Sequence, residues 1–173
     1  MNPLELAYRQ TRYIVFDTNI EIKIDQVCAQ VDELLEKHNA NEWAFITAEN
    51  PFSKRLTTEE NASKHQQLLK EVKDYLHFEG EGIGEDPNHK PEKSLLIIGI
   101  SAADAVSLGK HFEQNAIVLG KKNEPAQLEM IVNIETPMQK DQKKLRGFMK
   151  QMNSGKSFEE LDEETRIWWM NRY

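Results

Sequence analysis

The chain has 173 residues, 29% of them charged and 39% hydrophobic, with a formal net charge of −7 at pH 7. This composition excludes a disordered or membrane-embedded chain, and no apolar run approaches the roughly 20 residues that a membrane-spanning helix needs. The negative charge repels phosphate backbones and so disfavours nucleic acid as a partner. Cys28 is the single cysteine, which excludes an internal disulfide. The first residues have neither the basic start nor the apolar core of a signal peptide, so we expect a cytoplasmic protein.

The first predicted elements are extended. Residues 12–24 alternate apolar and charged side chains near their end, which is typical of a strand with one buried face, and a turn at Asp17–Asn19 would divide them into a hairpin. We expect Asp25 to cap a helix with an apolar face. A second strand, Trp43–Ala48, follows this helix and is ended by Pro51.

The middle of the chain contains a clear helix start. Thr57 and Glu60 stand at capping-box spacing, and the apolar stripe that follows is expected to run as far as Leu76. We then expect a loop over residues 80–91. In residues 94–100, the positions that would face either side of a strand are apolar. This pattern favours a central strand covered on both faces.

The remaining elements complete an α+β domain. Ser101 is expected to cap a helix, and strands are predicted at 116–119 and 128–134. The order β-α-β-α-β-α-β-β favours a central mixed sheet of five or six strands with about three packed helices. We place this domain at residues 8–136.

Residues 137–173 differ in composition and are predicted to form a helical tail. A basic block precedes Gly155 and an acidic block follows it, while Ser157 and Glu160 are spaced to cap a second tail helix. A helical hairpin with facing opposite charges accounts for this pattern. Exposed ion pairs contribute only about 0–1 kcal/mol each, so apolar side chains must anchor the hairpin. The candidate anchors are Leu145, Phe148, Met149, Phe158, Leu161, Ile167, Trp168 and Trp169.

The glycine-rich segment Glu79–Glu85 has two interpretations. Its alternating glycines could direct backbone N–H groups at an anion, but the spacing fits neither phosphate-binding fingerprint and carboxylates surround it. A strand or bulge whose glycines allow close packing is favoured instead. The carboxylates, Glu92 among them, could bind a cation or an amine, or one could act as a general base, although a solvated acidic loop is commoner.

No metal site and no cofactor site is predicted. The five histidines fall in no pair with metal-ligand spacing, and we expect each on a helix surface or in a loop. These histidines are His38, His65, His77, His89 and His111.

Polar side chains gather at the ends of several predicted elements. Such positions are often explained by local capping and Asx turns, in which side chains bond the neighbouring main chain. The alternative is a cleft lined by amides and a carboxylate. The residues concerned are Thr47, Glu49, Asn50, Asn61, Gln114 and Asn115.

An ordered set of short motifs resembles a bacterial domain-of-unknown-function family, number 3293, over roughly residues 8–133. The motifs are Tyr8-Arg9, Thr11-Arg12-Tyr13, Phe45-Ile-Thr-Ala-Glu-Asn-Pro51, Glu60-Asn61, Gly80-Glu-Gly82, Pro91-Glu-x-Ser94, Gly99-Ile-Ser101 and Gln114-Asn-Ala116. The resemblance implies no activity. The positions shared with the family include the polar residues at the strand ends, and they also include Glu92 and Ser94. Similar sequences usually carry an aromatic residue near Pro91, where Lys90 stands in this chain.

Three functional hypotheses follow. The first is a noncatalytic domain that binds a small polar ligand or a protein segment through Thr47, Asn50, Asn61, Glu92, Ser94, Gln114 and Asn115, because amides and hydroxyls recognise hydrogen-bond patterns but are poor acids and bases. The second is an enzyme with Glu49 or Glu92 as general base. The third is a protein-interaction or homodimerisation module that acts through Trp168 and Trp169 in the tail.

Overall fold

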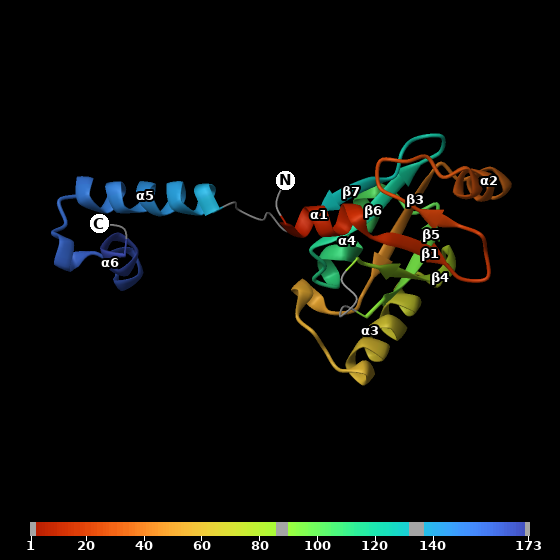
Figure 1. Cartoon of the computed structure of the whole chain (residues 1–173), viewed down its shortest axis with the longest axis horizontal. Coiled ribbons are helices and arrows are strands. Elements are labelled where there is room, and N and C mark those ends of the chain that lie inside the picture. The colour runs from red at the N-terminus through yellow and green to blue at the C-terminus, as the bar shows by residue number, and fades with distance from the viewer. Residues whose placement is uncertain (1–2, 86–89, 132–136, 172–173) are drawn as a thin grey trace. The chain divides into compact units, whose positions relative to one another are not determined.

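The computed structural model describes residues 3–85, 90–131 and 137–171 of the chain. The chain separates into two compact units, residues 1–132 and 133–173, each with its own internal contacts (Figure 1). Each unit is described here by itself. Within the described residues, no helix has the length and apolar character needed to cross a membrane.

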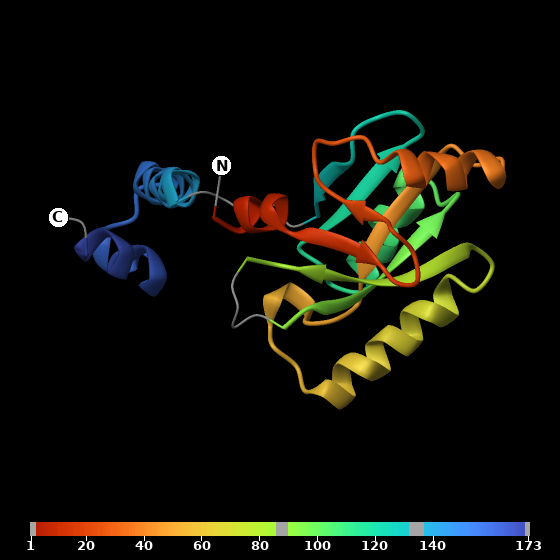
Figure 2. The ribbon, with the colours of Figure 1, turned by 45° about the vertical axis from the view of Figure 1, so that its right-hand side comes forward.

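The first unit is an α+β domain built on one curled antiparallel sheet (Figure 2). Its described part has seven strands, so the prediction of five or six is wrong, and all six strand pairings are antiparallel, so the prediction of a mixed sheet is wrong as well. The elements in order are α1 (Pro3–Gln10), β1 (Arg12–Val15), β2 (Glu21–Ile22), α2 (Ala29–Lys37), β3 (Glu42–Thr47), η1 (Pro51–Ser53), α3 (Thr58–Glu71), β4 (Leu76–Ile83), β5 (Glu92–Ile98), α4 (Ala102–His111), β6 (Ala116–Lys121) and β7 (Gln127–Met130).

Strand β5 lies in the middle of the sheet, whose strand order is β2-β1-β4-β5-β3-β6-β7. Its apolar residues Leu95–Ile98 contribute alternately to two hydrophobic clusters. One cluster packs against α2 through Val31 and Leu35, and the other packs against α3 and α4. The strand is therefore covered on both faces, which confirms the prediction made from its unbroken apolar run.

Several helix caps and turns that the sequence predicted are present in the structure. The Thr57 hydroxyl accepts from the Glu60 amide N–H and the Glu60 carboxylate accepts from the Thr57 N–H, which completes a capping box at the start of α3. The Ser101 hydroxyl caps α4 by accepting from the Asp104 N–H at 3.1 Å. The hairpin of β1 and β2 forms as expected. Strand β7 ends at Met130, and Ile134, expected in the same strand, lies outside the described residues.

The start of α2 was predicted wrongly. The helix begins at Ala29 with Cys28 at its N-cap, not at Asp25. Asp25 has a φ of 64°, whereas an N-cap residue adopts the extended region. Its carboxylate accepts a hydrogen bond from Arg9 at 2.6 Å, and Arg9 belongs to α1, a helix that was not predicted.

The segment after α3 was also predicted wrongly in part. The helix ends at Glu71, so Leu76 belongs to β4 and not to the helical stripe, and residues 80–83 are strand rather than loop. The strand interpretation of the glycines holds. A Cβ atom on Gly80 would lie 2.2 Å from the carbonyl oxygen of Ile14, because β1 pairs directly with β4 at this point. Only glycine permits that approach.

His65 is a further correction, because it was expected on a helix surface. It is 4% exposed and lies on the face of α3 that also carries the buried Leu68. Residues three apart share a helix face, so His65 is carried into the interface with the sheet. Neither of its ring nitrogens makes a hydrogen bond within the described structure, and the Glu79 carboxylate is 3.9 Å from Nε2.

The second unit consists of α5 (Pro137–Asn153), the short helix η2 (Phe158–Glu160) and α6 (Glu163–Met170). The capping box of Ser157 and Glu160 forms, but it begins η2, and Asp162 caps α6 instead. Lys144 and Glu164 form an ion pair at 3.3 Å, so oppositely charged residues do meet across the two helices. Phe148 stacks on Trp169 with ring centroids 4.2 Å apart and anchors the hairpin.

Candidate functional site

The first unit contains a cavity of about 560 Å³ beside helix α1. Strands β1, β3, β4, β5, β6 and β7 each contribute at least one lining residue, and α1 and the segment around η1 contribute others. Its apolar and aromatic lining residues are Leu4, Ala7, Tyr8, Tyr13, Phe45, Ala116, Ile117, Val118 and Leu128. Its polar lining residues are Gln10, Thr11, Thr47, Asn50, Ser53, Glu85, Glu92, Ser94 and Gln114.

The antiparallel pairing explains why polar residues far apart in the sequence meet here. Thr47, at the end of β3, pairs with Ser94, near the start of β5. Glu92, the first residue of β5, pairs with Gly82, near the end of β4. Because neighbouring strands run in opposite directions, the end of one strand lies beside the start of the next. The strand ends identified in the sequence therefore converge at one end of the sheet.

Asn50 is held by hydrogen bonds on both sides of its amide group. Its Nδ2 donates to Glu92 Oε1 at 2.7 Å, and its Oδ1 accepts from the Leu56 N–H and from Asn61 Nδ2, each at 3.0 Å. Its main-chain N–H donates to Asn61 Oδ1 at 3.0 Å. These bonds fix the orientation of Asn50 and of the Glu92 carboxylate beside the cavity.

The backbone next to Asn50 is strained. Asn50, Phe52 and Ser53 have φ values of 47°, 48° and 58°. Asparagine tolerates this region, but phenylalanine rarely adopts it, and such residues persist only where surrounding bonds hold them. The Phe52 N–H donates to the Glu113 carbonyl at 2.8 Å, which is one such bond. Ser53, the last of these three residues, lines the cavity.

Gln114 and Asn115 connect the start of β6 to the η1 segment. Gln114 is 4% exposed, and its Nε2 donates to the main-chain carbonyls of Glu49 and Phe112 at 3.0 and 3.1 Å. Asn115 Nδ2 donates to Ser53 Oγ at 2.7 Å. Both amides thus hold the chain after β3 in place.

Tyr8 of α1 completes this polar group. Burial raises the pKa of its phenol, hydrogen bonds with Asn115 and Ser53 oppose that effect, and the Glu92 charge adds to the increase. The phenol therefore stays protonated at neutral pH and can donate a hydrogen bond. Tyr13 donates its own phenol proton to the Tyr8 carbonyl at 2.9 Å, which links α1 to β1.

The seven predicted ligand-binding residues fall into two groups around this cavity. Five line it directly, whereas Asn61 and Asn115 are not lining residues and instead bond side chains that are. The lining residues are Thr47, Asn50, Glu92, Ser94 and Gln114. Local hydrogen bonding also occurs, because the Thr47 hydroxyl accepts from the Glu49 N–H and the Ser94 hydroxyl donates to the main-chain carbonyl of Glu92. The Thr47 hydroxyl in addition donates across the strand pair to the carbonyl of Lys93.

The two candidate catalytic carboxylates are placed differently. Glu92 lines the cavity, whereas Glu49 is buried and is not among the lining residues. Burial raises the pKa of the Glu49 carboxyl, a hydrogen bond from the Lys93 backbone opposes this, and the nearby Glu92 charge raises it further. Glu92 is therefore the candidate within reach of a ligand in this cavity.

Sequence reasoning missed the contribution of α1, and with it Tyr8 and Leu4. The signals for this short helix were present in the sequence: Pro3 at its start, Glu5 in its first turn and Arg9 four residues later. Glu5 accepts a hydrogen bond from Arg9 at 3.2 Å, as expected for this spacing.

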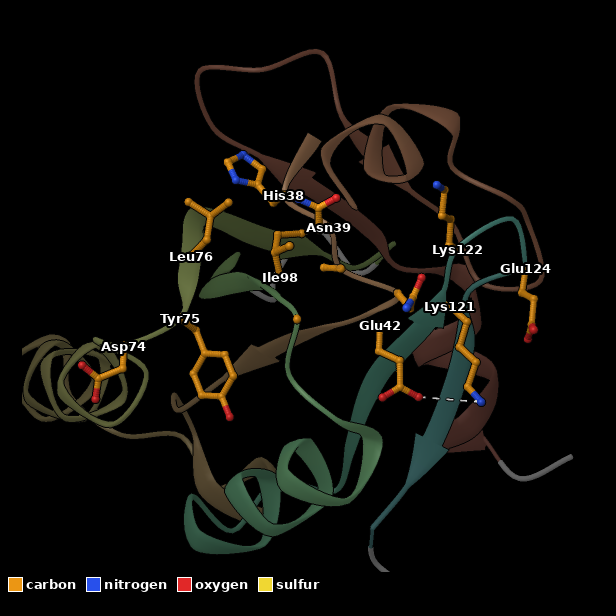
Figure 3. Close-up of a pocket in the computed structure, with 13 residues that line it drawn as sticks. His38, Asn39, Glu42, Asp74, Tyr75, Leu76, Ile98, Lys121, Lys122 and Glu124 are labelled. Atoms are coloured by element: carbon orange, nitrogen blue, oxygen red, sulfur yellow. Dashed lines mark ion pairs between the residues drawn. The ribbon is translucent and has the colours of Figure 1, made fainter. Parts of the chain in front are cut away.

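A second, larger hollow of about 850 Å³ lies at the opposite ends of the strands. Figure 3 shows its lining side chains spread apart, with Asp74 and Tyr75 on one side and Lys122 and Glu124 on the other. Glu42 pairs with Lys121 at 3.7 Å, and Lys122 pairs with Glu36 at 3.4 Å. Each lining lysine is thus engaged in an ion pair, and none of the predicted site residues lies there.

No group of three or more potential metal ligands occurs in the described ranges 3–85, 90–131 and 137–171.

Comparison with known families gives a match over part of the chain. Residues 46–117 match the family model described as a protein of unknown function (DUF3293), which confirms the resemblance found in the sequence. All seven predicted ligand-binding residues fall within this range, whereas Tyr8 lies outside it. No curated protein and no solved structure is significantly similar to the chain.

Proposed function

We propose that residues 3–131 form a noncatalytic domain that binds a small ligand in the cavity between α1 and the sheet. The observation that carries this proposal is the position of Asn50, which lines the cavity and is bonded to Glu92 and Asn61 from two other elements. A volume of about 560 Å³ is within the range of small-molecule sites, which are mostly apolar with a few fixed polar groups.

The chemistry of the lining favours recognition over catalysis. Among the described lining residues, the polar groups are amides, hydroxyls and two carboxylates. Amides neither donate nor accept protons readily at neutral pH, and the hydroxyl of Ser94 is occupied by a main-chain carbonyl. Prepositioned groups of this kind raise affinity by lowering the cost of ordering the site.

A small-molecule screen by NMR tests this proposal. Binding compounds are expected to shift the amide signals of Asn50, Ser94 and Gln114 and to be recovered unchanged. The substitution Gly82→Val should abolish those shifts, because a Cβ on Gly82 points toward Thr11 and Tyr13 at 3.5 and 3.8 Å, inside the cavity. Glu81→Val places the same side chain on the opposite face of β4 and should leave binding intact.

The enzyme alternative is decided by the same samples. Conversion of a bound compound by the native chain, lost in Glu92→Gln, would show that the domain is catalytic. Binding unchanged by Gly82→Val would place the ligand outside this cavity.

A second function, self-association through residues 137–171, is favoured by the exposed apolar side chains of this unit. Trp169 is engaged internally with Phe148, so the exposed residues rather than the tryptophan pair form the contact surface. They are Leu145, Met149, Met152, Ile167 and Met170. Sedimentation of the native chain and of the Met149→Glu variant tests this function: a native dimer that becomes a folded monomer supports it, and a native monomer at high concentration rejects it.

A further inference from the structure

We infer that the cavity selects an uncharged aromatic ligand that donates a hydrogen bond from an N–H or O–H group to Oε1 of Gln114, as an indole can. This inference rests on the proposed function and deepens it by naming the ligand class. It starts from the amide group of Gln114, a residue that lines the cavity although it is only 4% exposed.

The orientation of this amide group is fixed by its nitrogen. Nε2 donates to the carbonyl oxygens of Glu49 at 3.0 Å and of Phe112 at 3.1 Å, which uses both of its hydrogens. Carbonyl oxygens accept hydrogen bonds and cannot donate them, so the NH2 group of Gln114 and not its oxygen must face them. Oε1 therefore lies on the side of the amide group that is not bonded to the main chain.

Oε1 of Gln114 is an acceptor to which the protein supplies no donor. Within residues 3–85, 90–131 and 137–171, no group donates a hydrogen bond to it. Among the fully buried side-chain nitrogen and oxygen atoms of the same ranges, only the two ring nitrogens of His65 lack a hydrogen bond. Oε1 is therefore not fully enclosed, and the open space that Gln114 lines is the cavity. A poorly hydrated carbonyl oxygen gains from a donor that a ligand brings.

The other acceptors of the cavity wall are occupied or exposed. Oδ1 of Asn50 accepts two hydrogen bonds of 3.0 Å, which use both of its lone pairs. The Thr47 hydroxyl accepts from a main-chain N–H and donates to a main-chain carbonyl. Glu92 is engaged with Asn50, and Gln10 is exposed. Among the amide groups of the described lining, Gln114 thus provides the enclosed oxygen that is open to a ligand.

The wall beyond Gln114 is apolar and aromatic. Ala116 and Val118 follow it on β6 and line the cavity. Val118 pairs with Phe45 of β3 and with Leu128 of β7, which line the cavity as well. A flat aromatic ring buries a large apolar area against such a wall and can meet a phenylalanine ring edge to face. A charged group would lose its hydration there, which favours an uncharged donor.

Indole and benzofuran test the inference, because they share one bicyclic shape and differ in a ring N–H against a ring oxygen. Each is titrated into the native full chain, and NMR follows the main-chain amide signals of Thr47, Gln114 and Val118 together with the side-chain NH2 signals of Gln114. We expect indole to bind about tenfold more tightly, the ratio that one good hydrogen bond supplies. 1-Methylindole, in which the N–H is blocked, should bind as weakly as benzofuran.

A variant assigns the preference to Gln114. Gln114→Met replaces the amide by a thioether of similar length, so the affinity for indole should fall to that for benzofuran. A purely structural role of Gln114 would weaken both probes in the same proportion and leave their ratio unchanged. Gln67→Met makes the same substitution at an exposed position of α3 and should retain the preference.

A second pair of probes keeps the test independent of the variant. If Gln114→Met lacks a dispersed, folded spectrum, 2-naphthol and 2-methoxynaphthalene are titrated into the native chain. The hydroxyl compound should bind more tightly and shift the side-chain NH2 signals of Gln114, and equal binding of the two overturns the inference.

The outcomes separate this inference from the proposed function. Equal or tighter binding of benzofuran at the cavity signals overturns the donor preference and leaves the small-ligand function standing. A preference for indole that persists in a folded Gln114→Met variant overturns the role of Gln114. If neither indole nor benzofuran shifts the cavity signals, the inference fails, whereas the wider small-molecule screen decides the small-ligand function separately.

Discussion

Asn50 and Asn61 exchange two hydrogen bonds that join the end of β3 to the first turns of α3. The Asn50 N–H donates to Asn61 Oδ1, and Asn61 Nδ2 donates to Asn50 Oδ1, both at 3.0 Å. The pair fixes the left-handed backbone of Asn50, which in turn directs its Nδ2 at Glu92. The cavity wall thus depends on a residue of α3 that does not line the cavity.

The first prediction concerns this pair. Asn61→Ala removes both bonds and leaves the half-buried N–H of Asn50 without its partner, so we expect the free energy of unfolding to fall by about 1–3 kcal/mol. Urea unfolding followed by circular dichroism measures it. Gln67→Ala, at an exposed position of the same helix, should change the free energy of unfolding by no more than about 0.5 kcal/mol. Equal effects of the two substitutions would contradict the structural role of Asn61.

The two glycines of β4 should differ in their tolerance of alanine. Gly80→Ala places a Cβ 2.2 Å from the Ile14 carbonyl oxygen, which forces β1 and β4 apart, and we expect a loss of about 1–3 kcal/mol. Gly82→Ala meets only ordinary contacts at 3.5 Å or more, so it should be neutral or stabilise the strand by up to about 1 kcal/mol. Thermal and urea unfolding compare them, and the reverse order of stability would contradict the pairing of β1 with Gly80.

His65 should make the stability of the first unit depend on pH. Burial lowers the pKa of its imidazole, the Glu79 carboxylate opposes this, and the Lys93 charge lowers the pKa further. The folded state therefore binds a proton on His65 less readily than the unfolded state, whose histidine titrates near its ordinary value of about 6.5. Above pH 6.5 His65 is neutral in both states, so the stability of the folded state is at its full value as far as this residue is concerned. Below that pH the unfolded state binds the proton more readily, and the free energy of unfolding is expected to fall as pH decreases.

Urea unfolding between about pH 7.5 and 5.5 measures this dependence, since the ordinary histidine pKa lies between these values. His65→Leu should flatten it, because the variant has no imidazole to protonate at this site. His38→Gln, at an exposed position, should preserve it. A native chain with the same stability across this range would show that His65 is readily protonated in the folded state.

The second unit should lose its structure when its aromatic stack is removed. Phe148 is 8% exposed and its ring lies at 10° to that of Trp169, so Phe148→Ala removes the aromatic stack between α5 and α6. Replacing a buried phenylalanine by alanine costs about 3–5 kcal/mol, which is large for a hairpin of two helices. We expect the amide signals of residues 142–171 to collapse toward random-coil positions while those of Trp43 and its neighbours persist. Retention of the tail signals would contradict the anchoring role of Phe148.

The sequence by itself determined the features that depend on residues close together in the chain. The capping boxes of Thr57 and Ser157, the cap of Ser101 and the central strand β5 all follow from spacings of two to four residues. The polar positions at the strand ends were also visible, because they stand next to apolar runs: Thr47 directly follows one, and Asn115 directly precedes another.

Only the tertiary structure decided which of these positions meet. The convergence of Thr47, Glu92 and Gln114 requires the antiparallel order of the strands, which no local period specifies. The pairing of Gly80 with β1 depends on two backbones that are far apart in the sequence, and so does the position of Tyr8 in the cavity wall. Local interactions determine which residues form helices and strands. The burial of both sheet faces determines which strands pair, and the cavity follows from that pairing.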